Sequence, residues 1–214
     1  MTAPEAGPVR TQRGLERLIY FSDAVVAIAI TLIALPLVDS ARDVASSSTA
    51  KFLSDNSYAL TAAGVSFVVI SVLWRDHHRL FERATGYTPR LLRVNMVWLL
   101  CIVALPVATV LDVYSQRHDR LAVGLYVGVL VVAQATIRIE EFILYRAGML
   151  ADIDQITAED LAVRWINVAA TAIALVVAVA LPQIGLWSLL ILVVSGQLEA
   201  FAHRRKKART TPAD

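Results

Sequence analysis

Long apolar segments recur along this chain of 214 residues, and they constrain its fold more than any other feature. Most are close to the roughly 20 residues that a helix needs to cross the bilayer's hydrocarbon core, which is about 30 Å thick. Soluble helices would show a polar stripe every 3.6 residues, and stretches such as LVVAVALP have none. We therefore predict six membrane-spanning helices: Leu18–Val38, Tyr58–Trp74, Leu91–Val113, Leu121–Ile139, Val163–Leu181 and Leu186–Phe201.

The composition agrees with a membrane protein. Hydrophobic residues make up 57% of the chain and charged residues 18%, whereas soluble domains carry roughly 45–50% and about 25%. The high apolar content excludes a disordered chain, and a single cysteine, Cys101, excludes a disulfide scaffold. The net charge of +2 is too small to favour a nucleic-acid partner. The predicted fold class is an all-α protein with six transmembrane helices.

The positions of the basic residues predict the orientation of the chain. If successive helices alternate in direction, sixteen of the twenty Lys and Arg residues lie on one side of the membrane. The positive-inside rule places that side in the cytoplasm, so both termini of this multi-pass cell-membrane protein are expected there. The predicted organisation is a cytoplasmic tail over 1–16, a six-helix domain over 17–203 and a basic cytoplasmic tail over 204–214. The sequence HRRKKAR near the C-terminus is expected to contact anionic membrane lipids.

Several polar residues occur where the predicted helices would enter lipid. An ionisable residue inside a span is costly and usually faces a bundle interior or water. Asp23 lies inside the first predicted helix and is expected to need a partner. The polar residues at the same end of the second and third helices can provide one, and a fully paired network would fix the packing of these helices. The expected members are Ser22, Asp23, Trp74, His77 and Asn95.

Neither the histidines nor any short motif indicates a metal site or an enzyme. His77 and His78 are adjacent, so on a helix their side chains diverge by about 100°, which suits chelation poorly. No third histidine or cysteine stands at ligand spacing, and no H-E-x-x-H or phosphate-binding glycine motif is present. We predict no metal, no cofactor and no catalytic residue. A pH-sensing role for His77 stays open, because imidazole titrates near neutrality.

One face of the first predicted helix is apolar apart from a single threonine. Its residues follow the spacing i, i+3, i+4, i+7. Asp23 lies five residues before Ile28, about 140° away around the helix, so the two side chains face different directions. Periodicity alone leaves two interpretations open, a face that lines an axis and an ordinary lipid-facing or core surface. The face consists of Ile28, Thr31, Leu32 and Leu35.

The motif Arg17-x-x-x-Phe21-Ser22-Asp23, followed by an Ala-Ile…Thr-Leu run, resembles the first-helix signature of the transmembrane protein 175 family of potassium channels. The resemblance continues through the second and third predicted helices, and the remaining helices agree only in number and length. It is carried there by Trp74-x-x-His77-x-Arg79-Leu80-Phe81, Asn95 and Leu105-Pro106.

This resemblance implies a single-repeat, prokaryotic form of the channel, which assembles as a homotetramer with the first helix around a central pore. It implies a potassium-selective leak pathway with K⁺ as the permeant ion, and no TVGYG-type filter occurs in the chain. Ile28 would form the narrowest hydrophobic ring, Thr31 a hydroxyl ring one turn outward, and Leu35 or Leu32 a further apolar layer. The network that would brace the first helix comprises Arg17, Phe21, Ser22, Asp23, Trp74, His77 and Asn95.

A proton- or cation-coupled secondary transporter that uses Asp23 and His77 is the alternative. Transporters of this kind often contain helices broken near the bilayer midplane. We expect Pro36, Pro106 and Pro182 to lie near helix ends, which disfavours this alternative.

Overall fold

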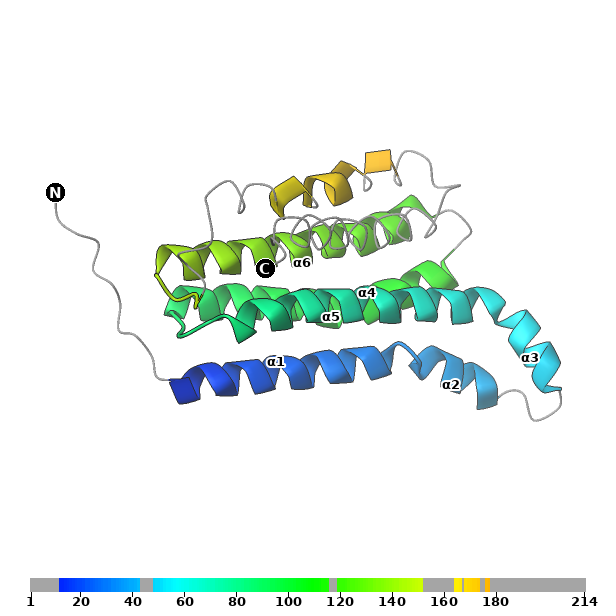
Figure 1. Ribbon diagram of the computed structural model, residues 1–214. Helices are drawn as coiled ribbons and strands as arrows, with labels where there is room; N and C mark the ends of the chain where they lie inside the picture. Colours follow the sequence, from blue (N-terminus) through cyan, green and yellow to red (C-terminus); the bar gives the residue numbers. More distant parts are fainter. Residues whose placement is uncertain are drawn as a thin grey trace, which may run out of the picture.

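A computed structural model of the chain describes residues 12–42, 48–115, 119–151, 164–166, 168–173 and 176–177. These residues form helices joined by short turns, which confirms the all-α class for this part of the chain. Figure 1 shows the long helices running side by side, with the short helices α2 and α3 together at one end. The helices are α1 (Gln12–Leu32), α2 (Leu35–Arg42), α3 (Thr49–Asp55), α4 (Ser57–Glu82), α5 (Pro89–Tyr114) and α6 (Arg120–Arg146).

Four segments of the described chain are long and apolar enough to cross a membrane. They correspond to the first four of the six predicted helices. Much of the fifth predicted helix and all of the sixth lie outside the described residues, although 164–166, 168–173 and 176–177 are helical. Six helices therefore stay a prediction. The four candidate spans are Gln12–Ala41, Ser57–Glu82, Pro89–Tyr114 and Arg120–Arg146.

All four long helices extend beyond the predicted boundaries, three of them by several residues. α1 begins at Gln12 instead of Leu18, α4 continues to Glu82, and α6 continues to Arg146. Hydropathy locates the apolar part of a helix, but backbone hydrogen bonds continue through charged turns until a residue ends them. After α6 this residue is Gly148, whose φ of 67° is in the left-handed region that glycine tolerates.

The expected placement near a helix end is correct for Pro36 and wrong for Pro106. The first predicted helix is interrupted at residues 33–34, and Pro36 lies in the first turn of α2, where a proline is well tolerated. Pro106 lies inside α5, which continues to Tyr114. Proline cannot donate a helical hydrogen bond, but neighbouring helices and hydroxyl side chains can accommodate such a position in a membrane helix.

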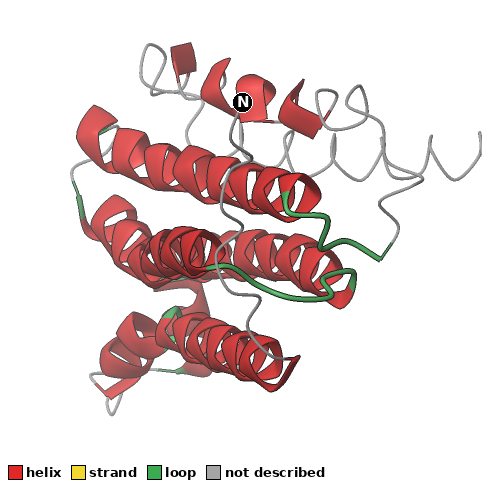
Figure 2. Cartoon of the chain, turned by 90° about the vertical axis from the view of Figure 1, so that its left-hand side faces the viewer, coloured by secondary structure: helices red, strands yellow, loops and turns green. Residues whose placement is uncertain are grey.

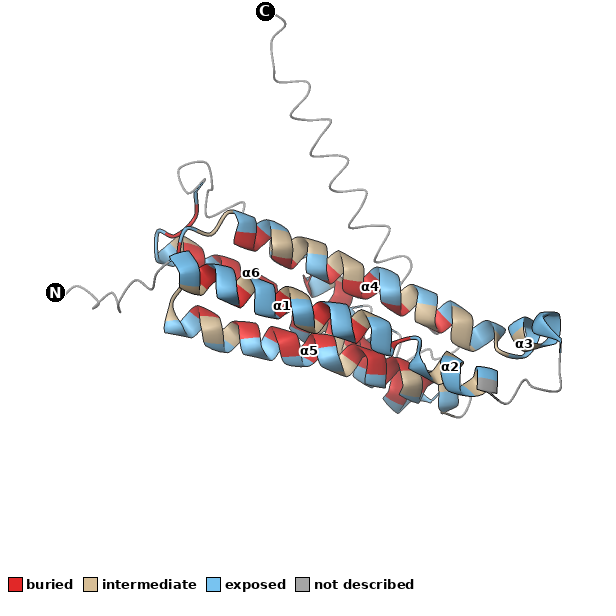
Figure 3. Cartoon of the chain, turned by 90° about the horizontal axis from the view of Figure 1, so that it is seen from below, coloured by how far each residue is buried: buried red, intermediate tan, exposed pale blue. Residues whose placement is uncertain are grey.

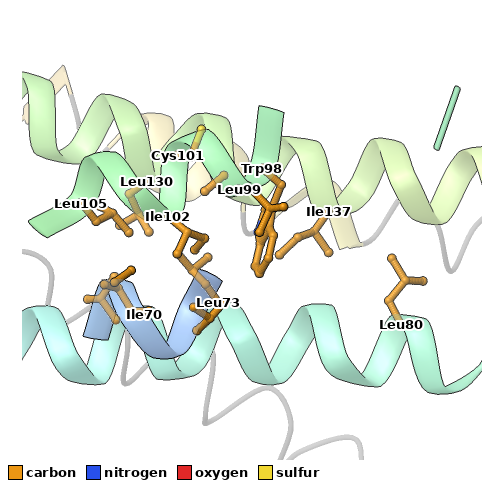
Figure 4. Packing of buried hydrophobic residues seen from close by; sticks show 14 of the residues in the cluster. Ile70, Leu73, Leu80, Trp98, Leu99, Cys101, Ile102, Leu105, Leu130 and Ile137 are labelled. Carbon is orange, nitrogen blue, oxygen red and sulfur yellow. The ribbon is translucent and has the colours of Figure 1, made fainter. Parts of the chain in front are cut away.

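The helices are arranged in layers with α5 at the centre. Figures 1 and 2 both place α1 on one side of α4 and α5, and α6 with the helical residues 164–166, 168–173 and 176–177 toward the other side. α5 contacts α1, α4 and α6. Figure 4 shows the resulting core, in which side chains from α4, α5 and α6 point toward one another. This core includes Ile70, Leu73, Trp98, Ile102, Leu105, Leu130 and Ile137.

Two turns are paired at the end of the bundle where α1 begins, which we call the basic end because it carries Arg17, Arg79 and Arg90. The α4–α5 turn (83–88) and the α6 turn (147–151) are joined by two backbone hydrogen bonds. The Thr85 amide donates to the Met149 carbonyl at 3.0 Å, and the Ala151 amide donates to the Arg83 carbonyl at 2.8 Å. The ends of α4 and α6 are thus tied together.

A buried carboxylate reinforces the same end. Glu141 is 2% exposed, and its oxygens pair with Arg138 at 3.0 Å and with Arg83 at 3.4 Å. Arg164 also donates to Glu141, which links the helical residues after the α6 turn to α6. The guanidinium groups come from three separate segments, so this one carboxylate holds the three together. Sequence analysis missed this group because Glu141 fell in a predicted loop.

Replacing Glu141 by Gln should destabilise the protein strongly, because partly buried arginines would lose the anion they surround. Breaking one side of a buried ion pair typically costs about 3–5 kcal/mol. Glu82→Gln is the matched control, since that carboxylate is 62% exposed and pairs only with His78 among the described residues. The control should change the free energy of unfolding by less than about 0.5 kcal/mol. Reversible denaturation in mixed detergent micelles, followed by circular dichroism, measures both, and equal effects would contradict the assignment.

Candidate functional site

α1 has one packed face and one open face. The packed face carries Leu15, Leu18, Ser22, Val26 and Ala29, all buried. The open face carries the residues predicted to line an axis: Ile28 is 60% exposed, Leu32 is 42% exposed and Thr31 is exposed. In Figure 3 this face appears as a run of exposed residues along α1. No helix in the described part of the chain covers it.

Leu35 lies on a different helix from the other residues of the predicted face. It begins α2, after the interruption at residues 33–34, and is 51% exposed. The assumed continuous helical register from Ile28 to Leu35 was therefore wrong, although all four side chains remain exposed. Within α1, the Thr31 hydroxyl donates to the Ile28 carbonyl at 2.8 Å. This bond uses the hydroxyl proton and leaves oxygen lone pairs available to a donor or a cation.

A directed chain of hydrogen bonds joins α1, α5 and α4. Ser22 donates to the Leu18 carbonyl at 2.9 Å, so its oxygen accepts from the Asn95 amide group at 2.9 Å. The Asn95 carbonyl oxygen must then accept from His77 Nε2, at 2.8 Å. Ser22, Asn95 and His77 are each at most 1% exposed. Asn95 is thus the central link between three helices.

Asp23 and Trp74 form a second, separate contact. The Trp74 indole N–H donates to Asp23 Oδ1 at 2.8 Å, linking α1 to α4. The predicted single network is therefore two sets, because adjacent residues of α1 reach partners on different helices. Aromatic stacking holds His77 in place. The centroid of its ring lies 3.9 Å from that of Trp98 and 4.3 Å from that of Phe81.

Arg17 and Phe21 lie on the open side of α1 and do not join these sets. Phe21 is 53% exposed, and Arg17 is exposed as well. Neither side chain hydrogen-bonds to the bracing residues within the described chain. The structure thus groups both with the open face that carries Ile28.

A third polar set lies in the half of the bundle away from the basic end, and sequence analysis did not identify it. Thr109 donates to the Leu105 carbonyl at 2.8 Å and accepts from Ser66 at 2.8 Å, and Ser66 in turn accepts from Tyr126 at 3.2 Å. Single hydroxyls in apolar helices were the available signal. Their partners depend on the contact register between helices, which the sequence pattern does not specify.

The two adjacent histidines have different surroundings, as their angular separation predicts. His77 is buried, while His78 pairs with the exposed Glu82 at 3.3 Å and stacks on Trp74. Among the described residues, no group of three or more His, Cys, Asp or Glu side chains could hold a metal ion.

Asn95→Ala should lower the free energy of unfolding by about 1–2 kcal/mol, because His77 N–H would lose its acceptor in a dry interior. Ser71→Ala is the control, since the Ser71 hydroxyl bonds a carbonyl of its own helix and is exposed. The measurement is again reversible denaturation in mixed micelles. Equal stability of the Asn95 variant and the wild type would show that the link contributes nothing.

Comparison with known proteins identifies similar sequences for the part of the chain that carries these contacts. Residues 17–106, from Arg17 on α1 to Pro106 inside α5, match the model for the endosomal/lysosomal potassium channel TMEM175. A potassium channel of Streptomyces collinus is 31% identical over 139 residues, which is 62% of this chain. The match spans 65% of that relative's length, just under two thirds.

A solved structure supports the same relationship at the level of fold. It is the crystal structure of a lysosomal potassium-selective channel TMEM175 homolog from Chamaesiphon minutus. It aligns with a TM-score of 0.65 and 23% sequence identity over 89% of this chain and 98% of that one. The matched family model and the Streptomyces relative are both described as potassium channels. The chain is therefore similar to the TMEM175 family over α1, α4 and much of α5, and it shares the fold of the Chamaesiphon homolog.

Proposed function

We propose that this chain is the subunit of a potassium-selective leak channel in the cell membrane, with α1 lining the conduction path. The observation that carries the proposal is the division of α1 into a packed face and an open face. Ile28 is 60% exposed, while Ser22 and Val26 on the opposite side are buried. The relatives named above as potassium channels support K⁺ as the permeant ion.

A second part of the proposal is a homotetramer. No described helix of the same chain covers the open face of α1, which is mostly apolar, so lipid or other copies of the chain can cover it. Copies of α1 around a common axis would cover this face with itself. Rings of Ile28 would then form the narrowest point and control conduction by excluding water, as hydrophobic constrictions do. Leu32 or Leu35 would add a further apolar layer.

Thr31 would contribute the polar layer. Its proton is engaged with the Ile28 carbonyl, so the oxygen presents lone pairs, and a ring of such oxygens can replace part of a cation's hydration shell. The hydrogen bonds of Asn95 with Ser22 and of Trp74 with Asp23 would hold α1 on the sides that do not face the conduction path. The positive-inside rule supports a cytoplasmic location for the basic end, where Arg79 and Arg90 lie.

A coupled transporter that uses Asp23 and His77 is a second candidate, favoured by one observation. The interruption of the first span at residues 33–34 is a break of the kind that transporters use at their binding sites. Its expected property is saturable flux that depends on a second ion. The hydrogen bond of Asp23 with Trp74 and the stacking of His77 favour the channel instead, because both side chains are held in place.

Potassium flux into liposomes that hold the purified protein tests the channel directly. We expect K⁺ flux to exceed Na⁺ flux and not to saturate or require a coupled ion. Ile28→Asn should increase flux and reduce selectivity, because a polar ring no longer excludes water. Leu100→Asn on α5 is the matched control, since Leu100 is 68% exposed and Ile28 60%. Equal effects of the two variants would remove Ile28 from the conduction path.

Thr31→Val separates the hydroxyl from the shape of the side chain. We expect the K⁺/Na⁺ permeability ratio to fall while the oligomer stays intact, because the variant loses the oxygen and keeps a branched side chain. Thr61→Val is the control, since the Thr61 hydroxyl is also exposed and bonds a carbonyl of its own helix at 2.8 Å. Reversal potentials in planar bilayers give the ratio. An unchanged ratio in the Thr31 variant would contradict the proposed polar layer.

A further inference from the structure

The first turn of α1 contains a glycine that lies against an aromatic ring. A Cβ atom at Gly14 would stand 2.6 Å from the Tyr87 hydroxyl oxygen and 2.7 Å from Tyr87 Cε1. Both distances are shorter than real Cβ contacts. Glycine is also a costly residue within a helix, by about 1 kcal/mol relative to alanine. With Tyr87 in this position, Gly14 is the residue that lets the helix approach so closely.

Tyr87 belongs to a turn that is fixed from several directions. The α4–α5 turn is bonded to the α6 turn through the Arg83 carbonyl and the Thr85 amide. Thr88, the next residue, caps α5, because its side chain accepts from the Leu91 amide at 3.1 Å. The Tyr87 ring itself packs against the hydrophobic core. The ring therefore has little freedom to move aside.

Gly14 lies at the edge of the packed face of α1 and is half-buried. At 100° per residue it stands about 40° around the helix from Leu18 and about 40° from Ile28, whereas Ser22 is about 80° away. A side chain at position 14 would push the start of α1 away from Tyr87, and so away from the side on which Ile28 lies. About 21 Å of helix separates the two positions at 1.5 Å per residue.

We propose that the contact between Gly14 and Tyr87 positions α1: Tyr87 is a stop that sets how closely the helix approaches the bundle, and hence the width of the conduction path. This inference rests on the channel function proposed above. Gly14 lies outside the family match, which begins at Arg17. Tyr87 acts through α1 and does not itself touch the permeant ion.

Flux through the full-length protein in liposomes tests the effect on conduction. Gly14→Ala should change K⁺ flux several-fold, because Gly14 and Ile28 belong to the same helix and its start is displaced. Tyr87→Ala in the same chain should bring the flux back close to the wild-type value, because it removes the obstructing ring. Gly64→Ala and Gly128→Ala are matched controls, since a Cβ at either helical glycine meets nothing within 4 Å. They should conduct like the wild type.

A distance measurement tests the displacement without relying on conduction. Spin labels at Glu16→Cys on α1 and Arg90→Cys on α5, both exposed positions, are placed in a Cys101→Ala background and diluted with unlabelled protein. The separation of the labels within one chain should increase in Gly14→Ala and return in the double variant with Tyr87→Ala. Tyr87→Ala alone should shorten or broaden the distribution, which keeps the test informative if Gly14→Ala folds poorly.

The outcomes separate the two proposals. A wild-type protein without K⁺ flux would overturn the channel function, and the label distances would still decide whether Tyr87 positions α1. Label distances that are unchanged in Gly14→Ala would overturn the positioning role. The positioning role would also be overturned by a change in K⁺ flux that Tyr87→Ala does not reverse, or by one that Gly64→Ala reproduces.

Discussion

A polar side chain buried inside a membrane protein must find its hydrogen-bond partners within the protein, because water does not reach it. Asn95 shows how this chain meets that requirement. One side-chain amide satisfies Ser22 on α1 and His77 on α4 while standing on α5. Since the Ser22 proton is committed to a backbone carbonyl, the direction of every bond in the chain follows. These bonds favour one arrangement of α1, α4 and α5, and the orientation of α1 depends on this arrangement.

The remaining contacts of α1 divide its surface into regions with different tasks. Trp74 and Tyr87 contact α1 near opposite edges of its packed face, one by a hydrogen bond to Asp23 and the other by steric contact at Gly14. The far side carries no contact within the described chain. A helix held along one side and bare along the other is suited to line an axis, because its position is set by contacts that leave the lining surface open. The proposed selectivity of Thr31 depends on this separation.

Much of this organisation could be predicted from the sequence, and the failures have physical causes. Apolar length located four spans, and the helix ends that carry Ser22, His77 and Asn95 predicted that these side chains would meet. Hydropathy did not locate the helix ends, because backbone hydrogen bonds continue beyond the apolar run, and Glu141 was missed for that reason. The contact between Gly14 and Tyr87 could not be predicted, because a glycine in a polar first turn belongs to no sequence pattern that indicates which residue it will contact.

The interruption at residues 33–34 has a consequence for motion. Backbone hydrogen bonds carry torque along a continuous helix, and α1 ends at Leu32 before α2 begins at Leu35. A rotation of α1 about its own axis is therefore not transmitted rigidly to α2 across the turn at residues 33–34. Rotation of α1 would carry Ile28 and Thr31 together, since both belong to the same rigid segment, and would leave Leu35 behind. Opening would thus change the alignment of successive layers instead of widening all of them at once.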